Sequence, residues 1–174
     1  MSSGLPSSEQ AIELLRKNNC PPEVVDHCLV VANLALDIAR RLLKKGLSVD
    51  LQLVEVGALL HDIGRSKTHG VSHGLVGGQI AESLDLPEAV VRIIKRHVGG
   101  GITAEEAEWF GWPKDVYVPV TLEEKIVSFA DKLIDQSKQV SVDVEIERLE
   151  ADGHKEAAER VRKLHEEITT LLGN

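Results

Sequence analysis

Histidine and aspartate residues occupy several positions where the helical pattern of this sequence calls for apolar or small side chains. These residues are His27, His61, Asp62 and Asp131. His27 follows Val24 by three residues and precedes Val31 by four, so its side chain should point along an apolar helical stripe. Asp131 lies one turn after Val127 and should also turn inward. The sequence therefore predicts that imidazoles and carboxylates from separate helices face the interior together.

Inward-facing carboxylates need a positive partner. An ionised carboxylate is costly to bury alone, and two of them would repel one another. A divalent metal ion bound by two imidazoles and two carboxylates would satisfy all four groups, and its open positions would hold water or a substrate oxygen. Neighbouring helix residues point about 100° apart, so His61 and Asp62 can share an ion mainly because Gly64 ends the helix. Such mixed ligands are compatible with Mn²⁺, Mg²⁺, Fe²⁺, Co²⁺, Ni²⁺ or Zn²⁺, as one ion or two.

Each of these residues also has a simpler interpretation. A single histidine on an apolar stripe, such as His27, is commonly a hydrogen-bonded core residue, and a His-Asp pair at a helix end is commonly a cap or an ion pair. Asp131 beside Lys132 could form an ordinary surface ion pair. The metal site is favoured because all these signals occur together on three different helices.

The elements that must position these residues are helical throughout. Serine or threonine followed three residues later by Gln or Glu indicates capping boxes at Ser7, Thr103 and Thr121. Apolar spacing predicts helices over about 7–19, 24–45, 51–62, 72–84, 87–97, 103–110, 121–134 and 142–172, with Ser72 as a cap. Because no segment alternates apolar and polar residues as a strand does, we predict an all-α fold of about seven or more irregularly packed helices.

Length and composition narrow the class of protein. The 174 residues suit a single domain, 1–174, with a core at about 23–137 and a C-terminal helical extension at about 142–172. Aromatic residues make up only 3% of the chain, which is a poor composition for stacking on exposed bases. The net charge of -8 repels polyanions, so we do not expect a nonspecific binder of duplex nucleic acid.

The sequence carries no sign of export or of membrane insertion. Met1 to Ser8 lacks the basic and apolar regions of a leader, and no apolar run approaches about 18–20 residues. Cys20 and Cys28 have no CxxC spacing and are expected to be reduced thiols. We therefore expect a cytoplasmic protein that does not contact a membrane.

The order of these motifs resembles that of a known family. His27, then HDIG at 61–64, then Asp131 within FADKL follow the H...HD...D pattern of the HD superfamily of metal-dependent phosphohydrolases, over about residues 23 to 137. The segments ITAEEAEWFGWP and TLEEKIVSFADKL are similar to a small archaeal group of stand-alone HDIG-domain proteins. The resemblance implies an all-helical domain in which His27, His61, Asp62 and Asp131 bind the metal. It also implies substrates that are phosphomonoesters or phosphodiesters, often of nucleotides.

The residue at position 65 distinguishes this chain from one branch of the superfamily and is similar to that of another branch. Deoxynucleoside monophosphatases carry a catalytic glutamate three residues after the HD aspartate, where this chain has Arg65. The two-metal phosphodiesterase branch has a basic residue after HDIG and two downstream histidines, which His73 and His97 resemble. That branch also has a doubled histidine and a GYP string, whereas Val98 follows His97 here and GYP is absent. A cyclic dinucleotide phosphodiesterase is therefore not supported.

The expected reaction is hydrolysis of a phosphate ester by metal-bound water, with a small phosphorylated molecule, in particular a nucleotide, as the substrate. Asp62 is the expected metal ligand and proton acceptor. Arg65 and Lys67 would bind the phosphate. His73 and His97 would hold a second ion or the substrate, unless they act as helix caps.

Other charged residues are weaker candidates. His69, in the loop after HDIG, could reach the site, and Arg96 and Lys132 could contact the phosphate. His154 and His165 are expected to be solvated residues of the last helix.

Two other classes of protein stay open. A helical binding or regulatory protein could use the metal structurally, without catalysis; a closed ligand shell favours that role, and an open water position favours catalysis. The apolar spacing of 4, 3, 4 and 3 residues from Ala157 to Leu171 could also pair the last helix with a second subunit in a homodimer. Because about two heptads is short for a coiled coil, packing onto its own domain is the favoured role of this helix.

Overall fold

Capping boxes fix the starts of three helices. In the computed structural model, which describes residues 4–174, the side chains of Ser7, Thr103 and Thr121 each accept a hydrogen bond from the backbone N–H three residues on. The Gln or Glu at that position accepts one in return from the backbone N–H of the cap. All three predicted boxes are confirmed. Met1 to Ser3, part of the segment searched for a leader, lie outside the described residues.

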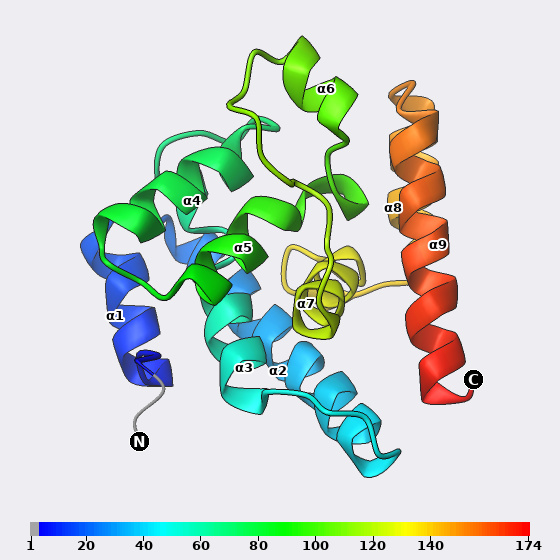
Figure 1. Ribbon diagram of the computed structural model, residues 1–174, viewed down its shortest axis with the longest axis horizontal. Helices are drawn as coiled ribbons and strands as arrows, with labels where there is room; N and C mark the ends of the chain where they lie inside the picture. The colour runs from blue at the N-terminus through cyan, green and yellow to red at the C-terminus, as the bar shows by residue number, and fades with distance from the viewer. Residues whose placement is uncertain (1–3) are drawn as a thin grey trace.

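Helices make up nearly all of the regular structure in the described residues. In chain order the elements are α1 (Ser8–Lys17), α2 (Pro22–Lys44), α3 (Leu51–Leu60), the 3₁₀ turn η1 (Ile63–Ser66), α4 (His73–Ser83), α5 (Glu88–Arg96), the 3₁₀ turn η2 (Val98–Gly100), α6 (Ala104–Trp109), α7 (Leu122–Lys132), β1 (Ile134–Asp135), β2 (Lys138–Gln139), α8 (Val142–Ala151) and α9 (Lys155–Leu172). The predicted all-α fold is confirmed (Figure 1). The C-terminal extension is two helices because Gly153, with a φ of 83°, breaks it.

Two local predictions are wrong. Ser72 stands before α4, but its side chain makes no cap hydrogen bond, because its backbone (φ -74°, ψ -1°) is already helical rather than extended. A short antiparallel hairpin of β1 and β2 exists where no strand was expected, with Ile134 opposite Gln139. Strands of two residues are too short to show an alternating pattern, and their turn depends on Gln136, whose φ is 56°.

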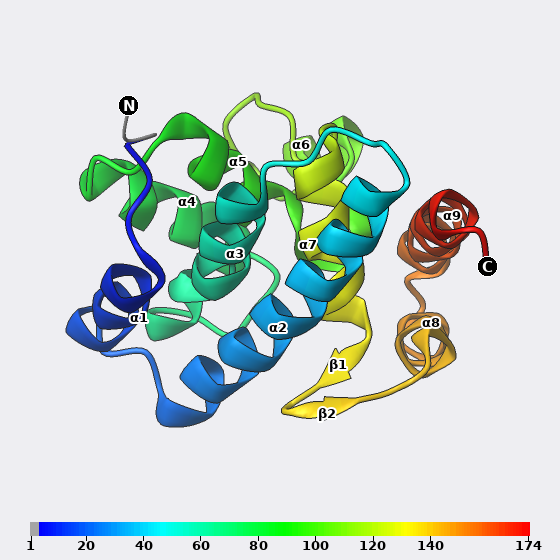
Figure 2. The same ribbon diagram turned by 90° about the horizontal axis from the view of Figure 1, so that it is seen from below.

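The core lies where α2, α3, α5 and α7 pack together. Figures 1 and 2 show α2 running through the molecule beside α3 and α7. Apolar side chains of these helices are buried in one cluster, among them Val31, Leu60, Ile94 and Val127. Burying each such side chain contributes about 1.5–3 kcal/mol relative to leaving it exposed. This cluster therefore fixes the ends of the helices relative to one another.

The last helix packs onto the rest of the chain. This is the role that its short apolar repeat favoured over pairing with a second subunit. Its buried residues are Ala158, Val161, Leu164, Ile168 and Leu172. His165 lies at the same contact, half-buried, with its ring centroid 5.6 Å from that of Phe129 in α7. The prediction that His165 is solvated is therefore wrong, because α9 lies against α7. His154 is exposed, as predicted.

Gly64 allows two chain segments to approach closely. A Cβ added at this position would lie 1.9 Å from the carbonyl oxygen of His73 and 2.7 Å from the backbone nitrogen of Gly77. A side chain at position 64 would therefore push η1 away from α4. The absence of a Cβ brings Asp62, just before η1, next to the start of α4.

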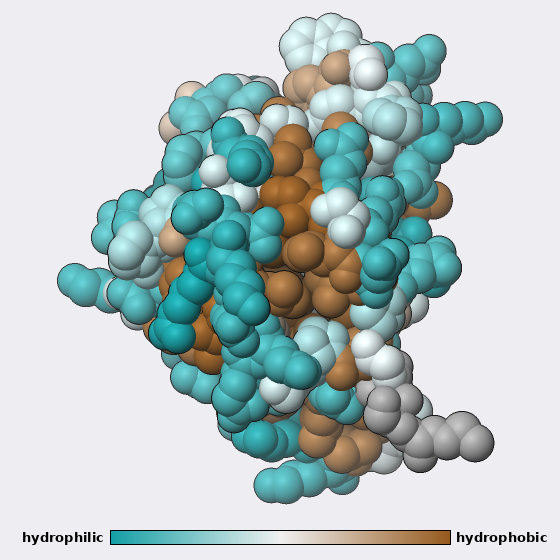
Figure 3. Space-filling model, turned by 90° about the vertical axis from the view of Figure 1, so that its left-hand side faces the viewer, coloured by the Kyte–Doolittle hydropathy of each residue, from teal (hydrophilic) through white to brown (hydrophobic). Residues whose placement is uncertain are grey.

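The face that carries α1 and α4 shows a strip of hydrophobic residues between hydrophilic ones (Figure 3). Contiguous apolar surface of this kind is common where proteins associate. A homodimer, left open by the sequence, is not tested by the structure, and this strip is one surface where such a contact can be sought. Across residues 4–174, no helix combines the length and the apolar character needed to cross a bilayer.

Candidate metal centre

Six side chains converge where helix ends meet. They are His27 in α2, His61 at the end of α3, Asp62 before η1, His73 at the start of α4, His97 at the end of α5 and Asp131 in the last turn of α7. The four predicted metal ligands and the two histidines proposed for a second ion or the substrate thus lie at one place.

A backbone carbonyl orients each of the four histidines. The Nδ1 atoms lie 2.6 Å from the oxygen of Gln136 for His27, 2.6 Å from that of Ala58 for His61, 2.8 Å from that of Gly70 for His73 and 2.7 Å from that of Ile94 for His97. A carbonyl oxygen only accepts hydrogen bonds, so each Nδ1 carries the proton and donates it. In its neutral form each imidazole therefore directs an Nε2 lone pair toward the centre, as metal-binding histidines do.

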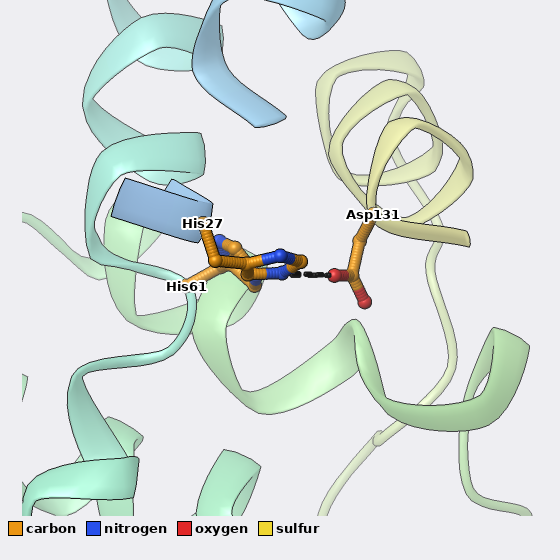
Figure 4. A group of neighbouring side chains, drawn as sticks. All are labelled: His27, His61 and Asp131. Atoms are coloured by element: carbon orange, nitrogen blue, oxygen red, sulfur yellow. Dashed lines mark hydrogen bonds and ion pairs between the residues drawn. The ribbon is translucent and has the colours of Figure 1, made fainter. Parts of the chain in front are cut away.

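The first group of ligand atoms comes mainly from His27, His61 and Asp131. Oδ1 of Asp131 lies 2.9 Å from Nε2 of His27 and 3.3 Å from Nε2 of His61. Figure 4 shows both imidazoles facing this carboxylate from the opposite side. Oδ2 of Asp62 completes the group, at 3.7 Å from Nε2 of His27 and 3.6 Å from Nε2 of His61.

The second group of ligand atoms surrounds the other oxygen of Asp62. Oδ1 lies 3.3 Å from Nε2 of His73 and 3.3 Å from Nε2 of His97. The two imidazole nitrogens are 3.1 Å apart. Because the two oxygens of Asp62 face different groups, this carboxylate could serve as a ligand in both.

These atoms fit a bound cation. When the imidazoles are neutral and protonated at Nδ1, their Nε2 atoms and the carboxylate oxygens are all acceptors, so only a cation or added protons can satisfy them. Nε2 of His61 is fully buried and makes no hydrogen bond to any described residue. An unsatisfied buried polar atom of this kind costs about 1–3 kcal/mol. Imidazole and carboxylate ligands together suit several divalent ions, and the residues present fit one ion or two.

The charges of the centre act strongly on one another. Burial disfavours the ionised form of Asp62, but the adjacent His61, His73 and His97 outweigh this and hold the pKa of Asp62 well below its usual range. Burial opposes a charge on His61 too, yet the carboxylate of Asp62 raises the pKa of His61 well above its usual value. At His97 burial dominates and lowers the pKa to about 4. The centre therefore attracts positive charge while keeping His97 neutral.

Arg65 lies at the mouth of the centre. Its Nε donates to Oδ2 of Asp62 at 2.9 Å, and its Nη1 donates to the carbonyl oxygen of His69 at 3.3 Å. Since a guanidinium has five N–H donors, Arg65 keeps others for a substrate oxygen. Lys67 is exposed and does not line the pocket beside the centre.

Lys132 and Arg96, the two weaker phosphate candidates, are held by other parts of the chain. Nζ of the buried Lys132 donates to Oδ2 of Asp131 at 2.7 Å and to the carbonyl oxygen of His97 at 2.9 Å. Nη1 of Arg96 donates to both carboxylate oxygens of Glu124, at 3.0 Å each. The pair of Asp131 and Lys132 is thus a buried ion pair rather than a surface one.

A pocket of about 560 Å³ opens onto the first group of ligands. It is lined by Glu23, Val24, His27, Asp62, Arg65, His69, Asp131, Lys132, Ile134, Asp135, Gln136, Glu145 and Arg148. His73 and His97 are not among these lining residues, so the second group lies deeper, behind Asp62. His69 does line the pocket, as its position after HDIG suggested.

Sequence reasoning missed the far side of this pocket and one positioning contact. Asp135, Glu145 and Arg148 reach the pocket from the hairpin and α8, and burial raises the pKa of the Glu145 carboxyl. The carbonyl of Gln136 orients His27 from the hairpin turn. No sequence signal marks these residues, because the charged residues of α8 have the same pattern as an ordinary solvent-exposed helix face.

The geometry defines a class of protein: an all-helical domain whose helix ends carry histidine and carboxylate ligands around a pocket. The family model of the HD domain matches residues 24–134 of this chain. This chain belongs to the HD domain family, and the predicted membership is confirmed.

Relatives of known sequence cover nearly all of the chain. It is 46% identical to the uncharacterized protein MJ0778 of Methanocaldococcus jannaschii, over 94% of this chain and 98% of that protein. It is 36% identical to the tRNA (cytidine(56)-2'-O)-methyltransferase of Picrophilus torridus, over 97% of this chain and 48% of that protein. The chain thus spans about half the length of the methyltransferase.

A solved structure has the same fold. The HD domain of the Listeria monocytogenes phosphodiesterase PgpH, in complex with cyclic-di-AMP, matches with a TM-score of 0.57 and 20% sequence identity. The match covers 94% of this chain and 96% of that one. At this identity, the likeness establishes the helical HD fold.

Proposed function

We propose that this chain is a metal-dependent phosphohydrolase that cleaves a phosphate ester of a small substrate, with a nucleotide as the favoured class. The observation that carries the proposal is that four imidazole Nε2 atoms converge on the carboxylates of Asp62 and Asp131, at 2.9 to 3.3 Å from the nearest carboxylate oxygen. Divalent ions bound there would activate a water molecule as nucleophile and polarise a phosphoryl oxygen.

The residues of the chain would perform separate tasks. Asp62 is ionised, because the neighbouring imidazoles hold its pKa well below its usual range, and it would hold both ions and accept the proton of the attacking water. Arg65 would offset the charge that develops on the phosphoryl oxygens. Lys132 would keep Asp131 oriented toward the first group by binding its outer oxygen.

Catalysis is favoured over a purely structural metal because the centre is open on one side. A structural site closes its ligand shell against water, whereas a catalytic site keeps an open position. The pocket reaches His27, Asp62 and Asp131, which all belong to the first group. A small molecule can therefore approach the ligand atoms.

Known HD domains support a nucleotide as the substrate. The PgpH domain carries cyclic-di-AMP in its crystal structure, so this helical fold accommodates a nucleotide. A cyclic dinucleotide is less favoured for this chain because Val98 stands where the related phosphodiesterases have their second adjacent histidine.

The metal content of His73→Ala and His97→Ala tests the second group. We expect the wild-type protein to hold two ions per chain after dialysis, and each variant to keep about one, since the first group stays intact. Hydrolysis should fall about 100-fold. Elemental analysis by mass spectrometry measures the ions, and His154→Ala, which alters an exposed histidine, is the control. An unchanged metal count in both variants would remove these histidines from the ligand set.

Arg65→Met tests the phosphate-binding role. Loss of a donor that stabilises the transition state should lower kcat about 100-fold, with the metal content preserved. Lys67→Met is a matched control, because Lys67 is exposed and outside the pocket, and its kcat should stay within about twofold of the wild type. Steady-state kinetics on a phosphomonoester measures both variants. Equal losses in the two variants would mean that general surface charge, rather than Arg65, attracts the substrate.

A further inference from the structure

Residues other than the candidate metal ligands make up much of the pocket lining. Its far side consists of residues that we call the outer wall: Glu23, Asp135, Gln136, Glu145 and Arg148. Four of these five follow residue 134, where the match to the HD domain ends. They come from the hairpin and from α8, which follows the hairpin in the chain (Figure 2). The part of the pocket that meets the rest of the substrate is thus built from this chain's own C-terminal segment.

The charge of the outer wall disfavours a second phosphate. Three carboxylates stand against one guanidinium there. That guanidinium, of Arg148, is already paired with Asp135 at 3.5 Å and with Glu145 at 3.4 Å. An additional phosphate would meet net negative charge, so a polyphosphate or a continuing nucleic-acid backbone fits this wall poorly.

The composition of the outer wall also disfavours recognition of a base. None of the described residues lining the pocket is Phe, Tyr or Trp, the side chains on which bases stack. Carboxylate oxygens are instead good acceptors for hydroxyl groups, as in the binding of ribose by an acidic residue. Burial raises the pKa of Glu145, and a carboxyl group hydrogen-bonds to a hydroxyl in either protonation state.

We propose that the outer wall binds the hydroxyl groups of a sugar, so that the substrate is a singly phosphorylated sugar or ribonucleoside whose base is not read. This inference rests on the proposed phosphohydrolase function. The phosphate lies at the metal centre beside Arg65, and the sugar extends toward Glu145 and Asp135. A pocket of about 560 Å³ is of the size that small ligands occupy.

The test compares kcat/KM of the metal-loaded full-length protein on five esters. They are ribose 5-phosphate, adenosine 5'-monophosphate, its 2',3'-dideoxy analogue, adenosine 3',5'-bisphosphate and 4-nitrophenyl phosphate. The first two should agree within about threefold. Each lost hydroxyl should cost on the order of tenfold, so the dideoxy analogue should be about 100-fold poorer. The bisphosphate should also be hydrolysed more slowly than the monophosphate.

A variant of the wall completes the test. Glu145→Leu should reduce the 100-fold preference for the ribose hydroxyls to about tenfold. Glu147→Leu, at an exposed position on the same helix and outside the pocket, should change neither this preference nor the rate on 4-nitrophenyl phosphate.

The possible failures are distinguishable. Equal rates on the ribo and dideoxy compounds, preference for the bisphosphate, or a strong loss with ribose 5-phosphate relative to the nucleotide would each overturn the sugar proposal while the phosphohydrolase function stands. Absence of hydrolysis of every ester, including 4-nitrophenyl phosphate, would overturn the proposed function and the sugar proposal with it.

Discussion

Asp62→Ala is expected to lose the bound ions and to lower phosphoester hydrolysis at least about 1,000-fold. The effect is large because one side chain serves both ligand groups: Oδ2 faces His27 and His61, while Oδ1 faces His73 and His97. Removing it leaves four imidazoles with a single carboxylate, Asp131. The second group then has no carboxylate oxygen and the first group has only that of Asp131, so each group has lost a ligand for a divalent ion.

Metal analysis and a panel of phosphomonoesters and phosphodiesters, run on the wild type and the variant, measure this effect. Asp37→Ala is the control, because it removes an exposed aspartate of α2 and changes the net charge of the protein by the same amount. Thermal unfolding should show that both variants are folded. Equal turnover by the wild type and Asp62→Ala would falsify the proposed site, and lack of turnover by a metal-loaded wild type would favour the noncatalytic alternative.

Glu124→Ala is expected to lower the free energy of unfolding by about 3–5 kcal/mol. Glu124 is only 3% exposed, and it accepts hydrogen bonds from Arg96 and from the backbone N–H groups of Val120 and Thr121. Its removal leaves the charge of Arg96, whose side chain is 12% exposed, without its partner. Two backbone donors at the start of α7 also lose their acceptor.

Denaturant unfolding of Glu124→Ala and of the double variant Arg96→Met/Glu124→Met distinguishes the cost of an unpaired buried charge from the cost of lost packing. Replacing both charges by apolar groups should destabilise the protein less than removing one, because no unpaired charge stays buried. Glu166→Ala, on the exposed side of α9, should change stability by less than about 0.5 kcal/mol. A double variant as unstable as Glu124→Ala would mean that the cost is lost packing rather than an unpaired charge.

The Arg96–Glu124 ion pair, which stabilises the fold, also lies close to residues of the candidate metal centre. Arg96 immediately precedes His97, and Glu124 lies two turns before Asp131 on α7. The ion pair ties the end of α5 to α7, and Ser128 and Lys132 of α7 bind the carbonyl of His97 at 3.1 Å and 2.9 Å. The position of His97 therefore depends on α7 at several points.

Local sequence rules were sufficient for most of the helices. Capping boxes and apolar periodicity depend on residues three or four positions apart, and such neighbours interact whatever the rest of the chain does. The rules were wrong where the contact is distant in sequence. His165 is half-buried because α9 reaches Phe129 of α7, and Arg96 is bound to Glu124 rather than directed at a phosphate.

The sequence alone predicted which polar groups would face the interior together. An acid or an imidazole on an apolar stripe must be compensated, and that requirement follows from the cost of burying charge. His27, His61, Asp62 and Asp131 were all found in this way, and the tautomers of His61, His73 and His97 follow from carbonyl groups three residues earlier in the chain.

Only the tertiary structure decided how these groups are divided and what surrounds them. Whether Asp62 faces one ligand group or two depends on how η1, α4 and α5 approach one another, and this is set by contacts such as that of Gly64 with the start of α4. The outer wall likewise exists because the hairpin and α8 bring residues to the pocket that the start of α2 also lines. A periodic pattern records which face of a helix is buried, but not which distant segment buries it, and the pocket is formed by those distant segments.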